Sequence, residues 1–196
     1  MFDLILPVGF LAVTMAGSPG PNNLMLTASG AKFGFRKTVP HIIGVEAGMI
    51  LLLGLSALGL GVVFTRVPFL RKILKTAGCA YIVYLAFRTA LSKPGPSAGE
   101  TGRPMTVYEA AAFQFLNPKA YVISITAMSV YPLAGRLYAA SAVLILGIFA
   151  AVIPLMISLW AGFGTFIGTV LKSRGSGRLF QLLLGGLTLS SVLFLL

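Results

Sequence analysis

The sequence predicts an all-α integral membrane protein with six transmembrane helices, and three observations carry that prediction. Hydrophobic residues make up 57% of the 196-residue chain and charged residues only 10%, whereas soluble domains carry about 25% charged residues. The mean hydropathy is +0.96. Six separate stretches approach the length of about 20 mostly apolar residues that a bilayer span needs. So few polar groups cannot cover a globular surface of this size, which excludes a soluble protein.

The predicted spans follow one another along the chain. They are Leu4–Thr27, Val39–Thr65, Ile73–Leu91, Ala111–Val130, Leu137–Ile157 and Leu179–Leu196. The fifth span can continue through Trp160 towards Ile167. The only long polar stretch, Ser92 to Thr106, is rich in Pro, Gly and Ser and is expected to be a loop. We therefore expect one transmembrane domain built from a three-helix repeat at 1–91, a polar loop at 92–106 and a second three-helix repeat at 107–196.

The charge distribution predicts a membrane partner and no nucleic acid. Fifteen Lys and Arg against four Asp and Glu give a net charge of +11, but the basic residues lie in short clusters between apolar runs. Such clusters hold loops at the cytoplasmic face beside anionic lipid headgroups. Ten of the fifteen fall in the first, third and fifth connections, which predicts both termini outside. The cluster from Arg66 to Lys75 runs against that orientation.

The inventory of reactive side chains argues against an enzyme. The chain has one His, and its one Cys is Cys79, so neither a disulfide nor a metal site is expected and no cofactor is implied. Membrane-embedded hydrolases need a clustered nucleophile, base and acid, or metal ligands. The N-terminus lacks a basic region and carries Asp3, so a cleaved signal peptide is not expected.

The first span contains a polar, proline-rich break. Ser18 is followed by Pro19, Gly20, Pro21, Asn22 and Asn23. The prolines lack N–H groups and unwind the helix, and Gly20 permits unusual dihedral angles. The carbonyls that are freed cannot face lipid. They face either neighbouring helices around a simple kink or a hydrated substrate path, and the two asparagines favour the path.

The fourth span contains a second break, at Gln114, Asn117, Pro118 and Lys119. A half-helix that starts near Pro118 directs free N–H groups and its positive dipole end towards an anion, and Lys119 adds a full charge. This combination suits a carboxylate such as that of an amino acid. The alternative is that Lys119 extends to the cytoplasmic headgroups.

The two breaks occupy corresponding positions in two units of three spans. Because each unit has an odd number of spans, the two units enter the membrane from opposite sides, and a repeat is an inverted one. Interrupted helices at matching positions of inverted halves are the best indication in a sequence of a transporter's binding site.

Glu46 is the only acidic residue well inside an apolar run. An ionisable group there is costly and is a functional candidate: its protonation on one side and release on the other would couple transport to a proton gradient. The alternative is a structural pair with His41 or Lys119. His41 lies nearer the interface, and a position at headgroup level is expected for it.

Two pairs of glycines have the spacing of helix-packing motifs. Gly44 with Gly48 and Gly164 with Gly168 each form a GxxxG sequence, which allows close helix contact in lipid. Glycine-lined faces also permit a homodimer without requiring one.

Together these segments resemble a known family. The Pro19–Asn22 break, a basic loop at Gly34-Phe35-Arg36, the segment GCAYIVYLAFR at 78–88 and FQFLNPK at 113–119 are similar to the LysE/RhtB amino-acid exporters, most of all to their cysteine/O-acetylserine branch. The resemblance implies a bacterial inner-membrane efflux carrier for amino acids or their derivatives, driven by protons. It assigns the family motif to Pro19, Gly20, Pro21 and Asn22 in one half and to Asn117, Pro118 and Lys119 in the other, whereas Glu46 has no matching family position. A passive pore and a non-transporting scaffold subunit are the alternatives.

Overall fold

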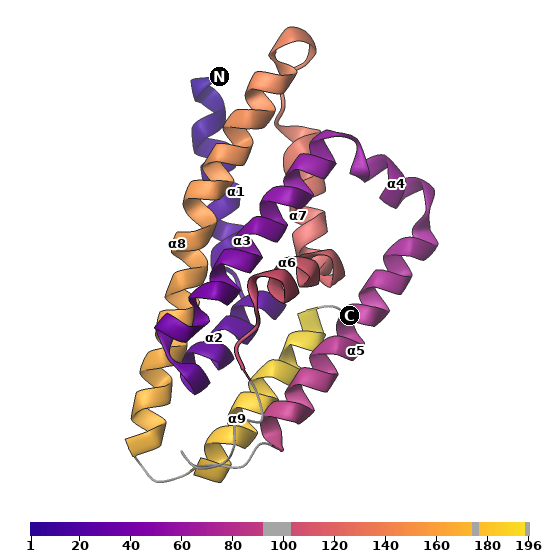
Figure 1. Cartoon of the computed structure of the whole chain (residues 1–196). Coiled ribbons are helices and arrows are strands. Elements are labelled where there is room, and N and C mark those ends of the chain that lie inside the picture. The colour runs from indigo at the N-terminus through magenta and orange to yellow at the C-terminus, as the bar shows by residue number, and fades with distance from the viewer. Residues whose placement is uncertain (92–102, 174–176, 195–196) are drawn as a thin grey trace.

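The computed structural model describes residues 1–91, 103–173 and 177–194, and every element in these ranges is a helix. The all-α prediction is therefore confirmed (Figure 1). In chain order the elements are η1 (Phe2–Leu4), α1 (Ile5–Gly17), α2 (Pro21–Phe33), α3 (Phe35–Ala57), α4 (Leu60–Arg66), α5 (Pro68–Ala90), α6 (Val107–Leu116), α7 (Pro118–Val130), η2 (Gly135–Leu137), α8 (Tyr138–Ser173), α9 (Gly177–Ser190) and η3 (Ser191–Phe194). Most of the expected polar loop, 92–102, lies outside the described residues.

Two helices in the described part of the chain are long and apolar enough to cross a bilayer. They are α3 and the stretch Gly135–Val170, which contains most of α8. The pair of α1 and α2, bent by 54°, makes a third if it counts as one span. These correspond to the second, fifth and first predicted spans and define a helical membrane protein. The third, fourth and sixth spans remain predictions: α5 carries several basic residues, α6 and α7 are separate short helices, and α9 has 14 residues.

The boundaries around the second and third spans differ from those predicted. Helix α3 ends at Ala57 rather than near Thr65, because Gly59 adopts a left-handed conformation with φ of 104° and turns the chain into α4. Helix α5 begins at Pro68, since proline is favoured at the first helical position. Lys72 and Lys75 therefore lie on a helix and not in a connection between spans.

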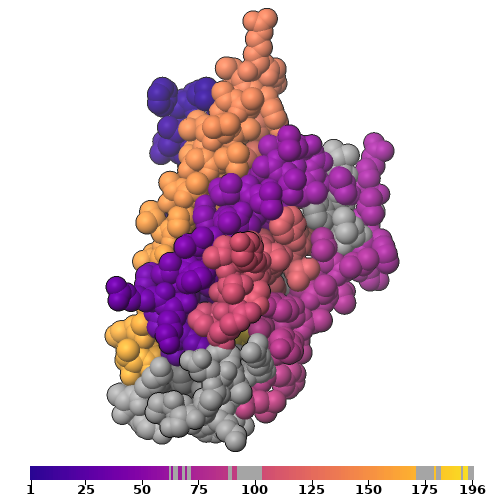
Figure 2. All heavy atoms as spheres, in the orientation of Figure 1, coloured from indigo at the N-terminus to yellow at the C-terminus, as the bar shows by residue number. Residues whose placement is uncertain are grey.

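The helices pack in a reciprocal arrangement. Helix α8 lies along α1 and α2, α3 lies against α6 and α7, and α5 pairs with α9. Figure 2 shows α3 running across the molecule between α8 and α6. In Figure 1 the chain runs down through α1, up through α3 and down through α5, and then in the opposite sense up through α7, down through α8 and up through α9.

Small residues let these helices approach closely. A side chain at Gly164 or Gly168 of α8 would collide with the backbone of Thr27 or Ala31 in α2. A side chain at Gly44 would collide with the carbonyl oxygen of Val107 in α6, and one at Gly48 with Ala111 and Gln114. Both GxxxG faces are thus covered by helices of the same chain.

Candidate functional site

Both predicted helix breaks are present, and a proline restarts the helix after each. Helix α1 ends at Gly17 and α2 begins at Pro21, while α6 ends at Leu116 and α7 begins at Pro118. Proline suits the first helical position because its missing N–H would have no intrahelical partner there. The first break leaves three residues outside the helices and the second leaves only Asn117.

Two asparagines shape these breaks. Asn23 Nδ2 donates to the carbonyl oxygens of Ala16 and Ser18, both at 2.7 Å, and so satisfies groups left free at the end of α1. Asn117 Oδ1 accepts from the backbone N–H of Lys119 at 3.1 Å and caps α7. The expectation of free N–H groups at this helix start is wrong, because Ala120 and Tyr121 also donate, to the carbonyl oxygen of Asn117.

Lys119 connects the second break to the first. Its Nζ donates to the carbonyl oxygen and the hydroxyl of Ser18, each at 2.8 Å, and to the carbonyl oxygen of Pro19 at 3.1 Å. A cation at the carbonyl end of α1 is also favoured by the helix dipole. The lysine therefore neither extends to the headgroups nor stands free for an anion.

Gly20 contributes space rather than an unusual dihedral angle. Its φ of 177° is an extended conformation open to any residue, which corrects the sequence-based explanation. A Cβ there would lie 3.0 Å from Lys119 Cδ and 3.2 Å from its Nζ. The missing side chain thus leaves room for Lys119 to cross the break.

A second bond links the breaks in the opposite direction. Asn22 Nδ2 donates to Gln114 Oε1 at 2.9 Å, joining the start of α2 to the end of α6. Asn22 and Lys119 both follow the proline that restarts their helix. Lys119 bonds to residues inside the first break, and Asn22 bonds to the last turn of the helix before the second break.

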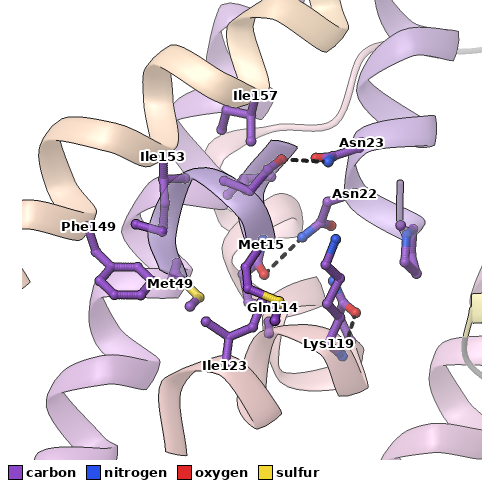
Figure 3. A pocket seen from close by; sticks show the side chains of 17 residues that line it. Met15, Asn22, Asn23, Met49, Gln114, Lys119, Ile123, Phe149, Ile153 and Ile157 are labelled. Atoms are coloured by element: carbon purple, nitrogen blue, oxygen red, sulfur yellow. Dashed lines mark hydrogen bonds between the residues drawn. The ribbon is translucent and has the colours of Figure 1, made fainter. Parts of the chain in front are cut away.

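A cavity lies where the two breaks meet (Figure 3). It measures about 480 Å³ including its open mouth. One wall is polar, and the opposite wall, from α1, α3, α7 and α8, is apolar. Seven predicted substrate-path residues line it: Gly20, Pro21, Asn22, Asn23, Gln114, Asn117 and Lys119. Pro19 and Pro118 are not among the lining residues.

The apolar wall was missed by the sequence analysis. It includes Met15, Met49, Ile123, Phe149, Ile153 and Ile157. No sequence signal distinguishes them, because apolar residues that face a cavity and those that face lipid look alike in a membrane helix. Ser18, which accepts hydrogen bonds from Lys119, was noted only as part of the break.

Glu46 lies on α3 beside this cavity but is not among its lining residues, although Val45 and Met49 are. Both carboxylate oxygens of Glu46 are buried and have no hydrogen-bond partner in the described structure. The alternative pairing with Lys119 is absent, since that ammonium contacts Ser18 and Pro19.

His41, which was expected at headgroup level, is enclosed by other parts of the protein. The residue is only 1% exposed, and neither ring nitrogen has a hydrogen-bond partner among the described residues. Helix α3 packs against α2, α6, α7 and α8, and this packing places His41 inside the protein.

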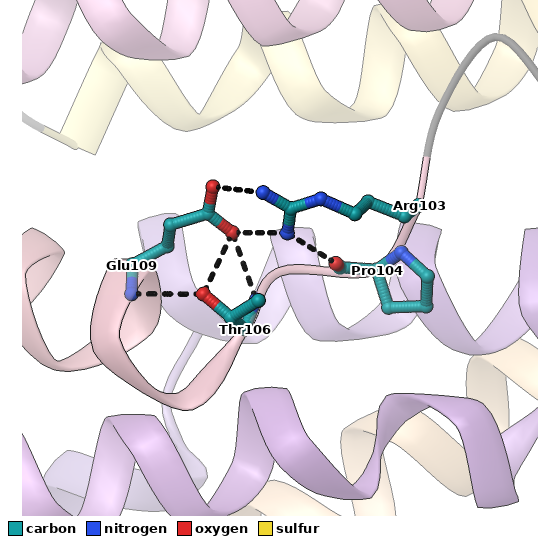
Figure 4. A network of polar contacts seen from close by, with 4 residues as sticks. All are labelled: Arg103, Pro104, Thr106 and Glu109. Carbon is teal, nitrogen blue, oxygen red and sulfur yellow. Dashed lines mark hydrogen bonds and ion pairs between the residues drawn. The ribbon is translucent and has the colours of Figure 1, made fainter.

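A polar network holds the start of α6 (Figure 4). Arg103 forms two bonds of 2.7 Å with the carboxylate of Glu109, and Thr106 and Glu109 form a reciprocal capping box. The Arg103 bonds, with those from Thr106, lower the pKa of Glu109 to about 2. The spacing of Thr106 and Glu109 is a sequence signature of a helix start that the sequence analysis did not use. The described residues contain no cluster of three or more His, Cys, Asp or Glu that could hold a metal.

Two broken helices that meet at a small cavity with one polar and one apolar wall are typical of a helical membrane transporter. Residues 13–135 match the LysE type translocator family. The chain belongs to this family, whose members are transporters and not enzymes.

Several relatives are named for an efflux function. The chain is 33% identical over 121 residues to proteins named "Cysteine/O-acetylserine efflux protein" from Escherichia coli (strain K12) and Shigella sonnei (strain Ss046). The match covers 60% of this chain and 60% of each relative, so this chain spans less than two thirds of the relatives' length. No solved structure matches.

Proposed function

We propose that the protein is a multi-pass protein of the bacterial inner membrane. There it acts as a secondary active exporter of amino acids or amino-acid derivatives. The observation that carries the proposal is the cavity at the junction of the two helix breaks, with amides and a lysine on one wall and apolar side chains on the other. An amino acid has the matching division into a charged head and a side chain. The efflux of cysteine and O-acetylserine named for the relatives supports small neutral substrates.

The fold we propose for this activity is a six-span inverted repeat, with halves at 1–91 and 107–196. Reciprocal packing supports it: α3 packs on the broken span of the second half, α8 packs on that of the first, and α5 pairs with α9. The opposite chain directions of the corresponding helices agree with this (Figure 1). Substrate then binds near the midplane of the bilayer, between the halves.

The breaks form the proposed substrate path. Pro19, Pro21 and Pro118 keep the helices interrupted, and Gly20 leaves room for Lys119 to cross the first break. The amide side chains beside these prolines offer hydrogen-bond donors and acceptors, which lipid does not. Lys119 stabilises the end of α1 through Ser18 and contributes its positive charge to the polar wall.

Glu46 is the proposed proton carrier. Its unpartnered, buried carboxylate supports the role, because a buried carboxylate without a partner is far costlier ionised than protonated. Val45 and Met49 on the same helix line the cavity, so a change in the charge of Glu46 acts on a helix that also contacts substrate. Protons and membrane lipid are the expected partners.

The test is uptake into inverted membrane vesicles of a panel of labelled amino acids that includes cysteine and O-acetylserine. Uptake is measured with and without an imposed pH gradient, for the native protein and for Glu46→Gln. We expect saturable, gradient-dependent uptake that loses its gradient dependence in the variant. Saturable uptake unchanged in Glu46→Gln would remove the coupling role and keep the exporter.

The same vesicles separate the alternatives. A carrier saturates and shows counterflow, whereas a passive pore shows neither. A protein that inserts normally but moves no member of the panel would favour a scaffold subunit and overturn the proposal.

A further inference from the structure

We infer that the Asn22–Gln114 amide pair binds the head group of the substrate, its α-ammonium and its α-carboxylate, and that the substrate is an α-amino acid with an uncharged, apolar side chain. The inference rests on the proposed function and specifies which residues of that site bind the head group of the ligand. It assigns head-group recognition to two neutral amides instead of to Lys119.

The first argument is that the pair is incompletely bonded. Asn22 Nδ2 donates to Gln114 Oε1, but Asn22 Oδ1 and Gln114 Nε2 are buried and lack partners in the described structure. Gln114 is only 1% exposed. Buried polar groups are rarely left unpaired, because losing water without gaining a partner is costly. Both residues line the cavity (Figure 3), so a ligand bound there can supply the missing partners.

The second argument is the chemical match between the pair and an amino-acid head. One free donor and one free acceptor suit a carboxylate, which accepts, and an ammonium group, which donates. A half-turn of an amide group exchanges its oxygen and its nitrogen. Exchanging them in both residues preserves the bond and again leaves one donor and one acceptor, so the conclusion does not depend on the assignment.

The third argument is that Lys119 is already engaged. An ammonium group has three N–H donors, and that of Lys119 makes three hydrogen bonds to Ser18 and Pro19. It is the only charged side chain among the residues that line the described cavity. A carboxylate can reach its donors only by breaking contacts that stabilise the end of α1.

The fourth argument concerns the side chain of the substrate. The wall opposite the amides consists of large apolar residues, among them Met15, Met49, Phe149 and Ile153. A charged side chain against this wall would lose its hydration without gaining a counter-charge. An apolar side chain instead gains from burial there.

The test uses the full chain in proteoliposomes with labelled L-methionine in counterflow. Two analogues compete: 3-(methylthio)propylamine, which lacks the carboxylate, and 4-(methylthio)butanoate, which lacks the ammonium. Native protein should bind each analogue at least tenfold more weakly than methionine, and lysine and glutamate should not compete.

The variant Gln114→Glu leaves Asn22 as the one NH2 group of the pair, and that group bonds to the new carboxylate. Only acceptors then remain free for the ligand, whichever way the native amides are oriented. It should lose at least tenfold in affinity for methionine and bind the amine more tightly than the acid. Asn22→Asp, at a less buried position, tests the same inversion if Gln114→Glu fails to insert. Ser124→Ala is the control, because its buried hydroxyl contacts Ser56 and Tyr121 outside the cavity, and it should keep the native order of ligands.

Three outcomes decide the matter. The head-group assignment would be overturned if one of the two analogues competed as well as methionine. It would also be overturned if Gln114→Glu and Asn22→Asp both kept the native order of ligand affinities. Counterflow of lysine or glutamate but not of methionine would overturn the side-chain class and leave the exporter intact. A protein that moves no amino acid would overturn the proposed function itself.

Discussion

The contact between α8 and α2 can be tested with two glycines on one helix. A Cβ added at Gly164 would lie 2.7 Å from the carbonyl carbon and 2.8 Å from the Cα of Thr27, and closer still to its carbonyl oxygen. A Cβ added at Gly162 would meet nothing within 4 Å. Replacing either glycine by alanine therefore changes the helix propensity of α8 by the same amount. Only the alanine at position 164 disturbs the packing of α8 against α2.

The expected magnitudes follow from these contacts. Replacing glycine by alanine inside a helix stabilises it by roughly 0.5–1 kcal/mol, and this gain applies to both variants. Overpacking costs about 1–3 kcal/mol. The upper end applies at Gly164, because the obstructing atoms belong to a helix backbone and cannot rotate away. We expect Gly162→Ala to raise the free energy of unfolding by up to about 1 kcal/mol, and Gly164→Ala to lie about 3 kcal/mol below it.

Trp160 provides the assay. It is the only tryptophan and lies one turn before Gly164, and its carbonyl oxygen accepts from the Thr27 hydroxyl at 3.3 Å. Its fluorescence, followed while SDS is added to the protein in mild detergent, reports on the contact between α8 and α2. Equal midpoints for the two alanine variants would refute the close approach of these helices.

Three further predictions concern other parts of the chain. Lys119→Met should lower uptake at least tenfold and the free energy of unfolding by about 1–3 kcal/mol, because carbonyls at the end of α1 lose a charged donor; native uptake in vesicles would contradict this. The stabilisation from Glu109, whose folded pKa is about 2 against 4.5, is present above pH 4.5 and is lost as the pH falls towards 2. Since the ion pair of Glu109 with Arg103 is largely exposed, the free energy of unfolding should fall by less than about 1 kcal/mol between pH 4.5 and pH 2. In Arg103→Ala, the free energy of unfolding measured over the same pH range should fall less than in the native protein. Gly59→Ala should lower the free energy of unfolding by about 1–2 kcal/mol, because Gly59 has a left-handed backbone conformation. An unchanged free energy of unfolding would contradict the turn between α3 and α4 at this residue.

The helix breaks could be predicted because their cause is local. Proline removes a backbone donor, and the polar residues beside Pro21 and Pro118 mark these positions as interruptions. Pro40 and Pro154, which lie among apolar neighbours or near a helix start, stay inside the continuous helices α3 and α8. The end of α3 was missed because its cause at Gly59 is a backbone conformation. Glycine permits that conformation but does not require it, and the apolar sequence continues beyond it.

The partners of the polar residues could not be predicted, since they depend on which helices meet. Lys119 was expected to face either an anion or the headgroups, and it instead bonds to residues about 100 positions earlier in the chain. His41 was placed by its distance from the end of a span, which says nothing about the helices packed around it. Hydropathy resolves position along a membrane helix and not direction around it.

The two bonds between the breaks have a mechanical consequence. Lys119 satisfies carbonyl oxygens at the end of α1, and Asn22 satisfies the amide oxygen of Gln114, so each half of the chain holds polar groups that the other half completes. Moving the halves apart would expose these groups in apolar surroundings, where each unsatisfied group costs several kcal/mol. A substrate that bonds, as inferred above, to the free atoms of Asn22 and Gln114 adds a further link between the halves. On that inference, separating the halves at this point costs more with substrate bound than without it, so the substrate stabilises the closed arrangement of the two breaks.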